Sequence, residues 1–284
     1  MKYVITMRHG EFLMSILLDV TGKLPSGLVE MYRAVSDSSD GLPFLIVGAM
    51  ARDLVLHHGF GAPIERGTRD VDFAIRVDSW EDFHELKVRL LGNGFMEDSR
   101  LNYRFRFTDS EEFEWEMDIL PFGEIEDESG DIVWPPDNEV AMSMLGFADA
   151  LEYSWEVTLS EGCVVKVATP ISMIVLKLVA WTERDRSLRA KDASDVGYII
   201  KNYNKISEIE NRLFEEGFME RNEWDMDLAT SELVGYEIPD QINDATYDYL
   251  KEQFSDANVS ENFIRDMNVG NSEEMFINLF KMIV

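Results

Sequence analysis

The spacing of apolar residues in the first part of the chain predicts helical structure. Leu13, Leu17 and Leu18 are spaced to share one face of a helix, so residues 1–40 are expected to form one or two helices. A turn-rich stretch, SDSSDGLP, closes this part of the chain. Residues 1–40 are therefore expected to be an N-terminal helical segment.

The middle of the chain has the pattern of a sheet with helices between its strands. Compact apolar runs and alternating polar and apolar residues predict the strands, and 3.6-residue periodicity predicts the helices. The expected strands are 44–47, the segment around Asp70 and Asp72, 103–107, 113–120 and two short strands within 153–167. The expected helices are 50–58 and 80–91. The strands at 103–107 and 113–120 are separated by a polar turn, which predicts a hairpin.

From Pro170 onward the pattern is helical and no strand is predicted. Helices are expected over 171–183, 193–203 and 205–216, and in several pieces to residue 284. The predicted organisation is the N-terminal segment, an α/β core over 41–168, and a helical C-terminal domain over 169–284.

Composition narrows the class of protein. The chain has 284 residues, of which 45% are hydrophobic, and no apolar run reaches the roughly 18 residues that span a bilayer. No secretory signal is recognised, so a cytoplasmic protein without a membrane partner is expected. Its only cysteine, Cys163, excludes an intramolecular disulfide and any site built from several cysteines. The 55 acidic and 26 basic residues give a net charge of −29, which disfavours a polyanionic partner unless a local basic patch exists.

Asp70 and Asp72 stand one residue apart in a segment that otherwise reads as a buried strand. Alternate strand residues share a face, so the two carboxylates point the same way, while Val71 and Phe73 point the other way. Neighbouring carboxylates repel each other unless the site is wet or holds a cation. A hard divalent metal would satisfy both. The alternative is a solvated face of a half-exposed strand.

Asp118 is the best candidate for a third acidic ligand, which would allow two metal ions to bind. It shares one face of the strand at 113–120 with Glu114 and Glu116, and it lies nearest the carboxyl end of that strand. A solvated acidic face explains Glu114 and Glu116 better than it explains Asp118.

Gly48 and Lys177 complete the candidates for phosphate binding. Gly48 joins a buried strand to a helix, whose N-terminal N–H groups favour anions. Lys177 interrupts an apolar helix, so its ammonium must either meet an acid or reach a nucleotide phosphate. A cluster of bases follows in ERDRSLRAKDASD, and these are Arg184, Arg186, Arg189 and Lys191. Asp192 and Ser194 in the same stretch could instead cap the next helix.

Four motifs in this order resemble those of a known family. They are VGAMARDL at 47–54, RGTRDVDF at 66–73, a helical lysine at 177, and RAKDASDVG at 189–197. The chain is similar over about residues 44–203 to the AbiEii-type nucleotidyltransferase-like toxins, within the DNA polymerase beta-like nucleotidyltransferase superfamily. The resemblance implies an α+β fold with a mixed twisted β-sheet of nucleotidyltransferase type flanked by helices, and a helical C-terminal part.

The resemblance also implies roles for individual residues. Asp70 and Asp72 would bind Mg²⁺ or Mn²⁺, with Asp118 as third carboxylate, and Lys177 and Asp192 would complete the catalytic site. The nucleotide-binding residues would be Gly48, Ala49, Arg52, Arg66, Thr68 and Lys177. Members of the superfamily usually carry a glycine, serine or threonine where this chain has Ala49, so a hydroxyl contact to phosphate is missing.

The implied reaction moves a nucleoside monophosphate from an NTP to an acceptor hydroxyl on tRNA, a protein or a small molecule. The protein would then act as the toxin of a toxin–antitoxin pair, with a cognate antitoxin as partner. The alternative is a catalytically weakened nucleotide-binding or protein-interaction module on the same fold, which the alanine at position 49 favours.

Overall fold

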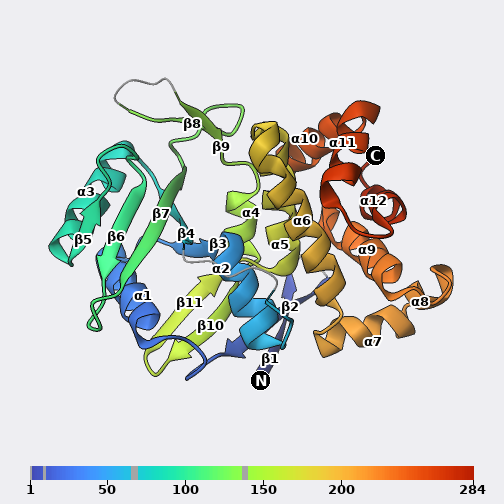
Figure 1. The fold of residues 1–284 in the computed structure, drawn as a ribbon, viewed down its shortest axis with the longest axis horizontal. Coiled ribbons are helices and arrows are strands. Elements are labelled where there is room, and N and C mark those ends of the chain that lie inside the picture. The colour runs from blue at the N-terminus through green and yellow to red at the C-terminus, as the bar shows by residue number, and fades with distance from the viewer. Residues whose placement is uncertain (1, 9–10, 65–69, 136–139) are drawn as a thin grey trace. The chain divides into compact units, whose positions relative to one another are not determined.

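Two compact units make up the chain, one built around a sheet and the other helical (Figure 1). The computed structural model describes residues 2–8, 11–64, 70–135 and 140–284, with side chains from residue 17 onward. The first unit comprises residues 1–59 and 63–169, and the second comprises 60–62 and 170–284. The division after Thr169 lies one residue from the boundary expected from the sequence.

The first unit contains a mixed sheet. In the described residues it has nine strands in the order β1-β2-β10-β11-β3-β4-β7-β6-β5, and β8 and β9 form a separate two-stranded sheet. The strands are β1 (Lys2–Arg8), β2 (Glu11–Asp19), β3 (Phe44–Val47), β4 (Asp70–Val77), β5 (Phe95–Glu97), β6 (Arg104–Thr108), β7 (Glu114–Gly123), β8 (Asp131–Val133), β9 (Ala141–Ser143), β10 (Trp155–Ser160) and β11 (Cys163–Val167). Strands β4 and β7 pair in parallel, and β6 and β7 form the expected antiparallel hairpin. The predicted α+β class with a mixed sheet is confirmed.

The expectation of helix throughout residues 1–40 is wrong for its first half. Residues 2–8 and 11–19 are strands β1 and β2, and only Ser26–Ser39 is helical, as α1. Strand β2 pairs in parallel with β10, with Leu17 opposite Glu156 and Leu18 opposite Val157. Leucine spacing is compatible with a helix, but pairing with a strand some 140 positions away decides the outcome, because strand formation depends on its tertiary partners.

Helix α1 packs on the face of the sheet opposite to the β4 aspartates. The helices of this unit are α1, α2 (Gly48–Arg52), the π-helix η1 (Asp53–Gly59), α3 (Trp80–Gly92) and α4 (Phe147–Glu152). Tyr32 of α1 contacts the ring of Phe73 edge to face, with the centroids 5.6 Å apart. Phe73 is one residue from Asp72 and so points to the other face, and α1 also packs against α3. The aspartates therefore lie on the face that α1 and α3 leave uncovered.

The second unit is a helical assembly around an aromatic core. Its helices are α5 (Pro170–Glu183), α6 (Arg186–Tyr203), α7 (Ser207–Glu215), α8 (Phe218–Arg221), α9 (Met226–Glu237), the 3₁₀-helix η2 (Pro239–Gln241), α10 (Asp244–Phe254), α11 (Ala257–Met267) and α12 (Ser272–Phe280). Trp181, Phe254 and Phe263 pack ring to ring inside it. Helix α6 begins seven residues before the expected start at 193, and its N-cap is Asp185. The alternative that Asp192 caps this helix is therefore wrong.

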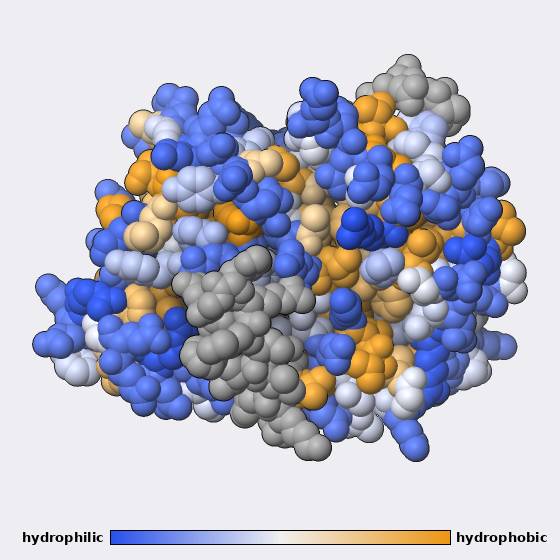
Figure 2. Space-filling view, turned by 180° about the vertical axis from the view of Figure 1, so that it is seen from behind, coloured by the Kyte–Doolittle hydropathy of each residue, from blue (hydrophilic) through white to orange (hydrophobic). Residues whose placement is uncertain are grey.

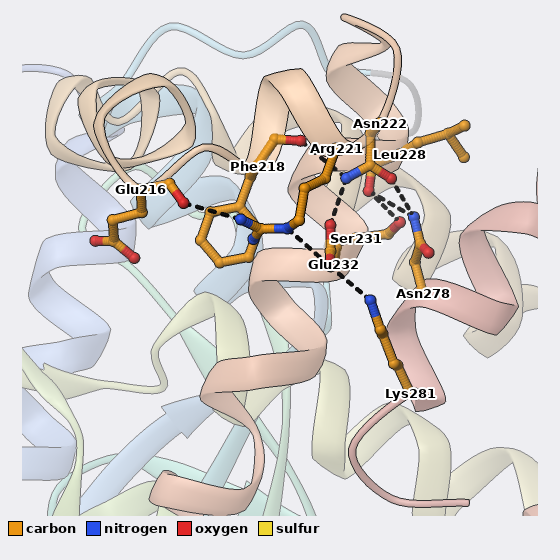
Figure 3. A network of polar contacts seen from close by, with 9 residues as sticks. All are labelled: Glu216, Phe218, Arg221, Asn222, Leu228, Ser231, Glu232, Asn278 and Lys281. Carbon is orange, nitrogen blue, oxygen red and sulfur yellow. Dashed lines mark hydrogen bonds and ion pairs between the residues drawn. The ribbon is translucent and has the colours of Figure 1, made fainter.

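A buried carboxylate joins α8, α9 and α12 in the second unit (Figure 3). Glu232 of α9 is only 2% exposed and accepts hydrogen bonds from Lys281 at 2.9 Å, from Arg221 at 3.3 Å and from Asn222. Burial by itself raises the pKa of Glu232, but the hydrogen bonds from Lys281 and Asn222 outweigh it and leave the pKa below its usual value. Glu232 therefore stabilises the packing of the last helices in its charged form.

The face of the molecule in Figure 2 is mostly hydrophilic, with apolar residues between the polar ones, in keeping with the high negative charge of the chain. Across the part of the chain that the structure describes, none of the helices is both long and apolar enough to cross a membrane.

Replacing Glu232 with glutamine should lower the free energy of unfolding by about 2 kcal/mol at pH 7, because the charge that two cationic side chains share is lost. Since the pKa of Glu232 is lowered in the folded state, the wild-type carboxylate stabilises the fold above pH of about 4.5 and less as pH falls through its folded pKa. The difference between the two proteins should therefore shrink in acid. Urea unfolding followed by circular dichroism at pH 7 and pH 4 measures it.

The exposed Glu220 of α8 provides the control, since Glu220→Gln should change stability by less than about 0.5 kcal/mol at either pH. Equal effects of the two substitutions would contradict the role assigned to Glu232.

Candidate active site

Strand β4 presents Asp70 and Asp72 on one side and buries the residues between and after them. Asp70 is exposed and Asp72 is half-buried, whereas Val71 and Phe73 are inaccessible to solvent. This is the alternation that the sequence predicts for the strand. The two carboxylates are consequently neighbours on the same face of the sheet.

The parallel pairing of β4 with β7 adds further acids to this face. Asp72 lies directly opposite Asp118, and Asp70 lies directly opposite Glu116. Directly paired residues of adjacent strands share a face, and their strands are about 4.8 Å apart. The register thus gathers four acidic residues, and their mutual repulsion requires positive charge close by.

Arg104 of β6 supplies positive charge to Asp118. Its Nε donates to Oδ1 of Asp118 at 2.7 Å and its Nη2 donates to Oδ2 at 2.8 Å, so both carboxylate oxygens are engaged. The hydrogen bonds to Asp118, with the charges of Glu116 and Asp70, raise the pKa of Arg104 above its usual value. Asp118 is 16% exposed and Arg104 29%, so this two-pronged ion pair is only partly screened by water.

The carboxylate oxygens on this face suit a hard divalent cation only in part. Asp70 and Asp72 are carboxylates on one face, which is the chemistry that Mg²⁺ or Mn²⁺ requires. The sequence predicts Asp118 as a third ligand, but the structure places its oxygens on Arg104. Within the described ranges, no three His, Cys, Asp or Glu side chains are grouped so that they could hold a metal ion. Asp70 and Asp72 therefore have the oxygen chemistry that a divalent cation takes, whereas both oxygens of Asp118 bind Arg104.

Gly48 brings the start of α2 against Asp72. Its backbone has φ +67°, and a Cβ built on it would lie 2.0 Å from Oδ2 of Asp72. Both the conformation and the close approach require glycine. No side chain caps α2, which runs on into η1. The first N–H groups of this helical run therefore lie beside the aspartates.

The other residues predicted to bind nucleotide have different surroundings. Arg52 is 4% exposed and binds the carboxylate of Asp53 through Nε at 2.9 Å and Nη2 at 2.8 Å. Its guanidinium is thus held within the fold. Ala49 is partly buried at the start of α2. Arg66 and Thr68 lie outside the described residues.

Lys177 and Asp192 meet in the second unit. Nζ of Lys177 lies 2.8 Å from Asp192 and 3.0 Å from Asp195, and Nη1 of Arg184 lies 2.8 Å from the other oxygen of Asp192. Asp192 is fully buried, and Lys177 is 15% exposed. The sequence predicts that the Lys177 ammonium either pairs with an acid or reaches a nucleotide phosphate, and the structure shows the pairing with acids.

Two members of these clusters are absent from the sequence prediction, although a signal existed for each. Asp195 follows Asp192 by three residues in α6, so both lie on one helical face. Arg104 faces Asp118 once the hairpin of β6 and β7 is given its register. The position of Asp195 follows from its spacing from Asp192 alone. The pairing of Arg104 with Asp118 follows only when the length of the turn between β6 and β7 is known.

The bases at 184–191 divide into exposed and packed residues. Arg189 binds Asp266 at 3.0 Å and stacks on Trp181, with 4.4 Å between its guanidinium carbon and the ring centroid. Arg186 and Lys191 are exposed, and Arg184 is 49% exposed while it contacts Asp192. Arg184, Arg186 and Lys191 are therefore the exposed bases of this stretch.

A family model described as "Nucleotidyl transferase AbiEii toxin, Type IV TA system" matches residues 30–269. No curated protein matches the chain. Among solved structures, an antigenic nucleotidyltransferase-like protein from Paracoccidioides brasiliensis is 19% identical over 62% of this chain and 76% of its own, with a TM-score of 0.39. The antibiotic-resistance factor ANT(2'')-Ia is 15% identical over 70% and 97%, with a TM-score of 0.35. The Thermotoga maritima CCA-adding enzyme complexed with tRNA is 15% identical over 91% and 70%, with a TM-score of 0.25.

Gly48→Ala should lower the free energy of unfolding by about 3 kcal/mol, because the new methyl group meets Asp72 in a backbone conformation that L-residues disfavour. Gly22 has a similar φ of +74° but open space around it, so Gly22→Ala should cost only about 1 kcal/mol. Chemical denaturation of both variants separates the steric contact from the backbone strain. Equal losses would show that Asp72 does not press on Gly48.

Lys177→Met should destabilise the second unit by about 3 kcal/mol, because it removes the cation that faces two buried carboxylates. Lys191→Met, at an exposed position of the same stretch, should change stability by less than about 0.5 kcal/mol. Thermal unfolding monitored by circular dichroism compares the variants. A Lys177 variant as stable as wild type would mean that the buried carboxylates do not depend on this ammonium.

Proposed function

Because the chain belongs to the AbiEii nucleotidyltransferase toxin family, we propose that it transfers a nucleoside monophosphate from an NTP to an acceptor hydroxyl. The observation that carries this proposal is the contact between Gly48 and Asp72. It brings the uncapped start of a helix, which suits phosphate, beside a pair of carboxylates, which suits a divalent cation.

In the proposed reaction the acceptor oxygen attacks the α-phosphorus of the NTP. The new bond joins that oxygen to phosphorus, the bond from the α-phosphorus to the bridging oxygen breaks, and pyrophosphate leaves. The acceptor proton passes to solvent or to a carboxylate of the site. Catalysis of this kind rests on positioning and on countering the charge that develops on the phosphate oxygens.

Each residue of the proposed site has a definite task. Asp70 and Asp72 would hold Mg²⁺ or Mn²⁺, which when bound neutralises phosphate charge. The backbone N–H groups of Gly48 and Ala49 donate hydrogen bonds to phosphate oxygens. Lys177 and Asp192 form an ion pair with each other in the second unit, and the catalytic role that the family resemblance implies for them stays part of the proposal. Arg52 supports the start of the helical run through Asp53.

The matching family model is described as a toxin of a type IV toxin–antitoxin system, which supports the proposal that this chain acts as a toxin with a cognate antitoxin. The acceptor is a tRNA, a protein or a small molecule. The exposed bases Arg184, Arg186 and Lys191 favour tRNA, because a polyanion would otherwise be repelled by a chain of net charge −29.

A second candidate function is a nucleotide-binding or protein-interaction module with weakened turnover. Ala49 removes a hydroxyl contact to phosphate, and Arg104 occupies both oxygens of Asp118. Calorimetry distinguishes the two functions: a module of this kind would bind NTP in the presence of Mg²⁺ without releasing pyrophosphate.

Asp70→Ala should reduce label transfer from α-³²P-labelled NTP to acceptor by at least about 100-fold, because the cation loses one of its two carboxylates. Each of the four NTPs is incubated with Mg²⁺, the purified protein and bulk tRNA, and labelled product is resolved on a denaturing gel. Glu114→Ala is the matched control, since Glu114 lies on the same face of the sheet at the far end of β7 and is half-exposed. Absence of transfer by the wild type defeats the tRNA version, and equal activity of both variants defeats the site.

A further inference from the structure

The pairing of Asp118 with Arg104 is the feature of this face that the proposed reaction does not use. The two residues lie directly opposite each other in the antiparallel pairing of β6 and β7, and Asp118 lies directly opposite Asp72. Asp72, Asp118 and Arg104 therefore form one row across three adjacent strands. The guanidinium stands at the end of that row, where it neutralises the carboxylate farthest from Gly48.

The geometry is that of a specific clamp. Two nearly equal hydrogen bonds, 2.7 and 2.8 Å long, join the fork of the guanidinium to the two carboxylate oxygens. Such a planar two-pronged pair is stronger and more directional than a single contact, and a lysine could not reproduce it. A carboxylate held in this way offers a cation only its remaining lone pairs, beside a fixed positive charge that repels the ion.

We infer that Arg104 takes the place of a second metal ion at Asp118, so that the site binds a single divalent cation on Asp70 and Asp72. This inference rests on the proposed function, because it concerns the metal content of the same site. Arg104 is a positioning residue: it fixes Asp118 and contributes permanent positive charge. Asp118 is then a structural anchor for Arg104 and not a metal ligand.

A purely structural reading of the pair is less satisfactory. The backbone already pairs β6 with β7 over five positions, so the strands do not need a side-chain clamp to stay together. The neighbouring arginine of β6, Arg106, shows what an incidental pairing looks like here. It lies 3.9 Å from Asp98 and 4.0 Å from Glu114, with no two-pronged contact. Arg106 is therefore the natural control for Arg104.

The test counts bound Mn²⁺ by electron paramagnetic resonance, with an NTP analogue whose α–β bridge cannot be cleaved. Wild type should bind about one ion per chain. Arg104→Met, which keeps an unbranched apolar stem but removes the guanidinium and its charge, should bind about two, because Asp118 becomes available beside Asp72. Arg106→Met should stay at about one. Two ions on the wild type, or one on Arg104→Met, would overturn the inference.

A second variant keeps the inference testable if Arg104→Met fails to fold. Asp118→Asn has the same shape and can still accept a hydrogen bond from Arg104, and it should change the Mn²⁺ dissociation constant less than about threefold. Asp72→Asn should weaken Mn²⁺ binding more than about tenfold. An equally large loss in Asp118→Asn would identify Asp118 as a ligand and overturn the inference.

The results of the Mn²⁺ experiments also distinguish a failure of the inference about Arg104 from a failure of the proposed nucleotidyltransferase function. Two ions on the wild type overturn the role of Arg104 and leave the nucleotidyltransferase proposal intact. Failure of the wild type to bind Mn²⁺ with the analogue, or unchanged binding in Asp70→Ala, overturns both.

Discussion

Strands β4 and β7 pair so that acidic residues lie directly opposite one another. The repulsion between these carboxylates is the constraint on which this face of the sheet depends. Parallel pairing places Asp72 beside Asp118 and Asp70 beside Glu116, so the fold must provide compensating positive charge. Part of it is built in, as the guanidinium of Arg104. The carboxylates of Asp70 and Asp72 on the same face have the oxygen chemistry that a divalent cation takes.

Much of the arrangement of the candidate site can be predicted from the sequence, because it follows from local periodicity. Alternation around Asp70 and Asp72 places both on one face, and the glycine after the strand at 44–47 marks the tight junction with α2. The interrupted apolar pattern at Lys177 implies a partner for its ammonium, and the structure provides Asp192 and Asp195. Such features depend on residues close together in the chain.

What the sequence could not supply depends on pairing between distant segments. The pairing of Arg104 with Asp118 follows only from the register of the hairpin, which the turn at 109–113 sets. The strand character of β2 follows only from its pairing with β10, since Leu13, Leu17 and Leu18 fit a helix equally well when considered alone. Helix α6 likewise starts earlier than its apolar pattern suggests, because three of the four residues of its first turn, Arg186, Ser187 and Arg189, are polar.

The position of β1 and β2 in the sheet has a practical consequence for trimming the chain. The family match begins at residue 30, after both strands, yet β2 lies between β1 and β10 within the continuous sheet. A version cut to the matched region would leave β10 with a row of unsatisfied backbone donors and acceptors. Exposed edges of this kind recruit strands from other molecules, so a shortened protein is expected to aggregate where the full chain does not.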